Sequence, residues 1–79
     1  MIVFVASYEH KHGTETRVYR TREAAAEWGN TIARENWSEW FPNEPMPDEN
    51  VGEVYFDLMI DKAIDWEFFR IDPCVVEPD

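Results

Sequence analysis

Two kinds of hydrophobic pattern divide the chain. Residues 2–8 and 14–20 are rich in β-branched and aromatic types, which is typical of strands, and Thr16 and Val18 share one face of the second run. The segment between them, 9–13, is short, polar and ends in Gly13, as a hairpin connection does. A final strand is predicted over 65–71, with Phe69 and Ile71 facing the core.

Between the second and the last of these strands, the apolar residues have the spacing of helices. Thr21 is a suitable N-cap for a helix running from Arg22 to about Trp37, with an apolar stripe formed by Ala25, Trp28, Ile32 and either Asn36 or Trp37. Three prolines in the segment 41–49 then predict an irregular connection. Asn50 followed by Glu53 resembles a capping box. It opens a second helix to about Ile64 whose core stripe contains Val51, Val54, Tyr55, Leu58 and Met59.

The predicted fold is therefore a single α+β domain spanning residues 1–79, in the order β-β-α-α-β. We expect a small antiparallel three-stranded sheet with both helices on one face and the first strand in the centre. A chain of 79 residues has a small core, and twelve aromatic residues (four Trp, five Phe and three Tyr) supply much of it.

Charge is distributed unevenly along the chain. Seventeen acids and seven bases give a net charge of -10. Residues 1–34 contain four acids and five bases, whereas residues 35–79 contain thirteen acids and only Lys62 and Arg70 as bases, so the second segment carries 2 − 13 = −11. The acidity therefore belongs to the second half.

Within that half, Glu53, Asp57, Asp61 and Asp65 recur every four residues and form one row along the second predicted helix, about 6 Å apart. Like charges at this spacing destabilise a helix by about 0.2 to 0.5 kcal/mol per pair. The row therefore favours a surface that presents negative charge to a basic partner. The alternative interpretation is an ordinary solvated face that serves only solubility.

Motifs for chemistry are weak. His10, His12 and Cys74 are candidate metal ligands, but a solvated turn explains the two histidines better, and no zinc, calcium or phosphate-loop motif occurs. No carboxylate pair stands out for acid-base catalysis. The sequence thus predicts no enzyme, cofactor or metal.

The lone cysteine and short apolar runs predict a protein of a reducing cytoplasm without a membrane span.

Aromatic residues offer a second way to bind a partner. Trp37, Trp40 and Phe41 either close the core under the proline-rich segment or form an exposed anchor, for which Trp40 is the candidate. Trp66 and Phe68, opposite Phe69 on the last strand, are candidates for the seam of a homodimer. Both a monomer and a homodimer are compatible with the sequence.

The layout resembles that of small phage-encoded and prophage-encoded proteins, among them anti-CRISPR inhibitors of type I systems. The shared features are the His-Lys-His-Gly hairpin at 10–13, the Thr-Arg-Glu-Ala-Ala helix start at 21–25, the Trp-rich helix end and the acidic second half. The resemblance implies a partner in the bacterial cytoplasm that binds nucleic acid, such as a subunit of a type I CRISPR effector complex (Cascade). It implies that the protein blocks target DNA binding by acting as a DNA mimic in charge, without binding nucleic acid itself. The candidate partner-binding residues are Glu35, Glu39, Glu44, Asp48, Glu49, Glu53, Asp57, Asp61, Asp65 and Trp40.

Overall fold

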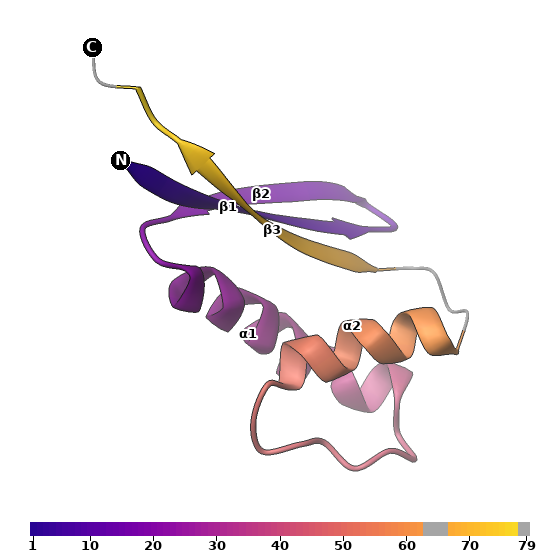
Figure 1. Cartoon of the computed structure of the whole chain (residues 1–79). Helices are drawn as coiled ribbons and strands as arrows, with labels where there is room; N and C mark the ends of the chain where they lie inside the picture. The colour runs from indigo at the N-terminus through magenta and orange to yellow at the C-terminus, as the bar shows by residue number, and fades with distance from the viewer. Residues whose placement is uncertain (63–66, 78–79) are drawn as a thin grey trace.

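The computed structural model describes residues 1–62 and 67–77 and contains the predicted elements in the predicted order (Figure 1). They are β1 (Ile2–His10), β2 (Gly13–Tyr19), α1 (Arg22–Trp40), α2 (Val51–Asp61) and β3 (Phe68–Val75). All strands are antiparallel in one sheet of order β2-β1-β3, so β1 is central. Both helices lie on one face of the sheet. The predicted α+β architecture is confirmed.

The β1–β2 hairpin is tighter than predicted. Its strands pair from Phe4 with Tyr19 to His10 with Gly13, which leaves Lys11 and His12 as the turn. Gly13 has a φ of 131°, a backbone conformation that favours glycine. The backbone N–H of His12 also donates to Nδ1 of the His10 side chain (3.2 Å). The histidine motif therefore builds the turn.

Helix α1 begins as predicted and ends three residues later than predicted. The Thr21 side chain accepts a hydrogen bond from the Ala24 N–H (3.1 Å), which confirms it as the N-cap. The buried face includes the predicted Ala25, Trp28 and Ile32, and continues to Trp37.

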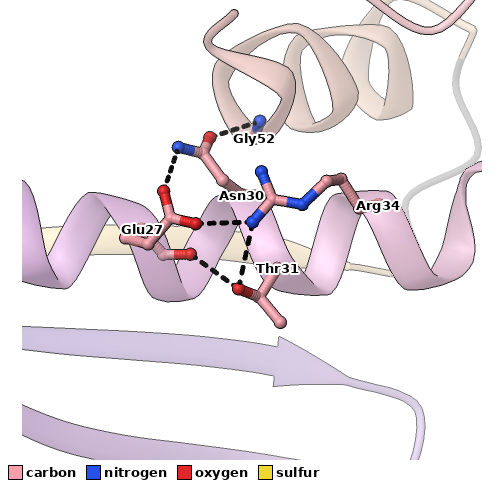
Figure 2. Close-up of polar contacts among 5 residues, drawn as sticks. All are labelled: Glu27, Asn30, Thr31, Arg34 and Gly52. Carbon is pink, nitrogen blue, oxygen red and sulfur yellow. Dashed lines mark hydrogen bonds and ion pairs between the residues drawn. The ribbon is translucent and has the colours of Figure 1, made fainter. Parts of the chain in front are cut away.

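The predicted cap of α2 is wrong. Asn50 has a left-handed backbone (φ 54°), and its side chain makes no capping hydrogen bond. Asn30 of α1 supplies the cap instead, because its Oδ1 accepts from the Gly52 N–H (2.8 Å) while its Nδ2 donates to Glu27 (Figure 2). A Cβ on Gly52 would lie 2.9 Å from the Gly29 backbone carbon, so α1 and α2 meet here at a distance that only glycine permits.

Aromatic rings fill the space between the helices and the sheet. The rings of Phe56 and Phe69 stack at 5.4 Å, and Trp28 meets Phe69 edge-on at 5.6 Å. Tyr55 and Met59 are completely buried, as the predicted stripe requires. The stripe did not include Phe56, which is buried because α2 packs against the sheet as well as against α1.

Strand β3 lies further along the chain than predicted, at 68–75 instead of 65–71. It is an edge strand, and an edge can accommodate Pro73, which has no N–H to donate. Phe69 and Ile71 pack against the core as predicted, whereas Phe68 is 42% exposed. Trp66, its predicted companion in a dimer seam, lies outside the described residues.

Among the residues that the structure describes, no helix is long and apolar enough to cross a bilayer.

Candidate functional site

The outward face of α2 carries three carboxylates. Glu53, Asp57 and Asp61 are all exposed and lie opposite the buried residues Val51, Tyr55 and Met59 of the same helix. Successive members are one helical turn apart, or about 6 Å along the axis. We call these three residues the α2 row. The fourth predicted member, Asp65, lies outside the described residues.

The connection between the helices brings its own acids to the two ends of α2. Asp48 and Glu49 are exposed just before the helix begins. Glu44 is half-buried and forms an ion pair with Lys62 at the other end of the helix (3.2 Å). The Glu44 backbone C=O also accepts from Nε1 of Trp37 (2.8 Å). Glu44 therefore stabilises the connection through its ion pair and its backbone hydrogen bond, whereas the side chains of Asp48 and Glu49 are exposed.

Bases compensate other acids of the molecule. Arg34 pairs with Glu27, Arg70 with Asp72 (2.7 Å) and Lys62 with Glu44, while His10 lies 3.5 Å from Glu15. The hydrogen bonds from Arg34 and Asn30 lower the pKa of the Glu27 carboxyl. Within residues 1–62 and 67–77, no base forms an ion pair with the α2 row, Asp48 or Glu49. Their charge is available to a partner.

The acids near the end of α1 occupy a different side. Glu39 lines a pocket together with the hairpin residues Lys11 and His12. Glu35 is exposed one turn earlier on the same helix. Helix α2, by contrast, contacts α1 at Gly29 and Asn30. Of the predicted acidic residues that the structure describes, Glu39 thus lies beside the hairpin, Glu35 lies one turn earlier on α1, and the others lie on α2 and its connection.

Of the three aromatic residues at the end of α1, two belong to the core. Trp37 is 4% exposed and Phe41 is 2% exposed, and their rings pack against Tyr55. Trp40 is partly buried, since it packs against the edge of the core, and it also lines the pocket beside Glu39. Trp40 is therefore the one of these three residues that a partner can reach.

A buried carboxylate that sequence reasoning missed lies beneath this pocket. Glu67 is 7% exposed, and its Oε1 accepts hydrogen bonds from the hydroxyls of Tyr8 (2.9 Å) and Tyr55 (2.7 Å). Burial, reinforced by the hydrogen bond to Glu67, raises the pKa of both tyrosine hydroxyls. The two hydroxyls therefore stay protonated and act as donors, so the group joins β1, α2 and the start of β3.

The pocket above Glu67 has a volume of about 170 Å³. The hairpin provides His10, Lys11 and His12 as one wall, and α1 provides the opposite wall through its last two turns. In the part of the chain that the structure describes, no three His, Cys, Asp or Glu side chains are grouped so that they could hold a metal ion. The three candidate ligands that the sequence offered, and for which a solvated turn was the favoured interpretation, do not lie together. Cys74 is exposed at the opposite end of β1 from His10 and His12, where it pairs with Val3.

Known proteins do not add to this description. Neither the known protein families, nor the curated proteins, nor the solved structures include a match to the chain.

One signal in the sequence pointed to Glu67. It is the only acid between aromatic neighbours on both sides, Trp66 and Phe68, in a segment that otherwise reads as a strand. Tyr8 and Tyr55 gave no such signal, because their positions in a strand and an apolar stripe are explained by their rings alone.

Proposed function

We propose that this protein is a non-catalytic inhibitor that occupies a basic, nucleic-acid-binding surface of another protein. The observation that supports this best is the α2 row, which is exposed and forms no ion pair with a described base. Asp48 and Glu49 add charge at the start of the same helix. The proposed contact surface consists of these five residues.

Folding alone does not favour this arrangement. Two like-charge pairs in the α2 row cost about 0.2 to 0.5 kcal/mol each, and a basic partner would relieve that repulsion on binding. Arg34, Lys62 and Arg70 pair with other acids. Arg17 and Arg22 lie over the rings of Trp28 and Phe4, so none of these bases compensates the row. A partner rich in Lys and Arg supplies the missing charge.

The resemblance to anti-CRISPR proteins suggests the partner, a DNA-binding subunit of a type I CRISPR effector complex in the bacterial cytoplasm. Such complexes hold nucleic acid in positively charged channels. Bound there, the protein would block the capture of target DNA. The α2 row has one charge per turn of about 6 Å, whereas duplex DNA has one per ~1.7 Å, so the protein would imitate the charge of DNA and not its helical geometry.

Docking through aromatic residues is the weaker alternative. It relied on Trp37, Trp40 and Phe41, and two of these three are in the core. Trp40 alone remains accessible, and it lies beside Glu39 and not on the proposed contact surface.

The experiment is a pull-down of the tagged protein from cells that express type I effector complexes, washed at low and at high salt. The test variant is Asp57→Lys/Asp61→Lys, and the matched control is Glu9→Lys/Glu77→Lys, which changes two exposed acids away from α2. Each double variant moves the net charge from -10 by +4 to −6.

We expect the natural protein and the control to capture an effector subunit in a salt-sensitive manner, and the α2 variant to lose it. Equal capture by the two double variants would contradict the proposed surface. Capture that survives high salt would contradict the electrostatic mechanism.

A further inference from the structure

The pocket between the hairpin and α1 is a separate feature from the α2 row, and its floor is a buried carboxylate. Oε1 of Glu67 is occupied by two tyrosine hydroxyls. Glu67 also lines the pocket. A carboxylate that is this deeply buried is stabilised by a positive charge or by further donors. Glu67 therefore gives the floor of the pocket a capacity to bind a cation.

The walls add to that capacity. Glu39 supplies a second carboxylate, Asn36 supplies an amide and Trp40 supplies an aromatic side chain. Lys11 is the one base among the described residues that line the pocket. The two carboxylates, Glu39 and Glu67, thus outnumber the one ammonium group in the pocket.

The hairpin turn also engages both ring nitrogens of His10. Nδ1 accepts a hydrogen bond from the His12 N–H (3.2 Å), and Nε2 lies 3.5 Å from the Glu15 carboxylate. The His10 ring is therefore held by contacts within the hairpin itself.

We propose that this pocket binds the guanidinium group of an arginine side chain. A guanidinium is planar, carries five donors for carboxylate and amide oxygens, and stacks on the face of an indole. Glu39, Glu67, Asn36 and Trp40 supply these partners in one pocket. An anion would be repelled by the two carboxylates. An ammonium group lacks the planar set of donors of a guanidinium and stacks less well on an indole.

This inference rests on the proposed function only for the source of the arginine, which is the basic partner. The hairpin turn that forms one wall of the pocket lies at the same end of the molecule as the C-terminal end of α2 (Figure 1). An arginine of the partner could therefore enter the pocket while neighbouring bases meet the α2 row. The pocket's own affinity is measurable without any partner.

The test is a titration of the ¹⁵N-labelled natural protein with N-acetyl-L-arginine methylamide, followed by NMR, with the Trp40 indole signal assigned from Trp40→Phe. The corresponding lysine and citrulline derivatives are the controls for shape and for charge. We expect a saturable shift of the Trp40 indole and the His12 amide, with little change at the buried Trp28 and Trp37. The arginine derivative should bind at least about tenfold more tightly than either control.

Glu39→Gln, at an exposed position, should weaken the arginine derivative at least about fivefold without unfolding the protein, since it removes one of the two carboxylates. Absence of a saturable shift, equal binding of citrulline, or unchanged binding in Glu39→Gln would each overturn the inference. Loss of arginine binding together with intact capture through the α2 row would reject this pocket alone. Arginine binding without salt-sensitive capture would reject the proposed function and leave the pocket.

Discussion

The carboxylates of the α2 row and the carboxylate of Glu67 are chemically alike but have opposite surroundings. Those of the row are exposed and form no ion pair with any base in the described part of the chain. The Glu67 carboxylate is buried and accepts two hydrogen bonds from side chains of β1 and α2. The difference separates acids that the fold needs from acids that the fold merely tolerates.

Removal of the buried carboxylate should have the largest effect on stability. Glu67→Ala leaves the hydroxyls of Tyr8 and Tyr55 without their acceptor, and each buried unsatisfied group costs about 1 to 3 kcal/mol. We expect the free energy of unfolding in urea to fall by about 2 to 6 kcal/mol. The control is Asp57→Ala, which removes an exposed carboxylate flanked by like charges and should lose no stability. Equal losses in the two variants would remove the distinction between the two regions.

High pH should destabilise the protein through the buried hydroxyls of Tyr8 and Tyr55. Because folding raises the pKa of Tyr8 and Tyr55, the folded protein binds more protons than the unfolded chain above about pH 10, the ordinary value for tyrosine. Their contribution to stability is therefore complete below that pH and is lost as the pH rises further. Circular dichroism and tyrosinate absorbance should change together for two of the three tyrosines. Ionisation of all three before any loss of structure would contradict this.

The contact between the helices should have an intermediate effect. Asn30→Ala removes the side chain that caps the Gly52 N–H, and loss of such a cap costs about 1 kcal/mol. Thermal unfolding should show the loss, while Asn43→Ala, an exposed amide in the connection, should leave stability unchanged. If Asn30→Ala unfolds at the same temperature as the natural protein, the Gly52 N–H must donate to another acceptor, which would contradict this role for Asn30.

The smallest effect should be a gain. Asp57 has a like charge four residues away on each side, so Asp57→Asn relieves two pairs at about 0.2 to 0.5 kcal/mol each, or about 0.4 to 1 kcal/mol in total. The gain should shrink at high salt, because exposed charges are screened. Comparison of urea unfolding at low and high salt measures it. A loss of stability would show that the row supports the fold.

The periodic parts of the fold were predictable from sequence, and the tertiary contacts were not. The order of elements, the central β1 and the Thr21 cap follow from local patterns. The Asn50 cap was wrong because an amide from another helix, Asn30, took its place. The end of β3 was placed too early because Pro73 reads as a strand breaker unless the strand is known to be an edge.

The candidate site shows the same division. The exposure of Glu53, Asp57 and Asp61 follows from helical spacing. The separation of Glu39 from them depends on how α1 meets the hairpin, which no local pattern encodes. Glu67 was not selected because its role depends on hydroxyls that come from residues 8 and 55, far away along the chain.

The most direct test of the central claim is the affinity of Asp57→Lys/Asp61→Lys for the captured effector subunit, measured beside its free energy of unfolding. The account predicts that binding is lost, that stability is retained, and that Glu9→Lys/Glu77→Lys binds like the natural protein. Full affinity in the α2 variant, with the fold intact, would contradict the claim that these carboxylates are there for a partner.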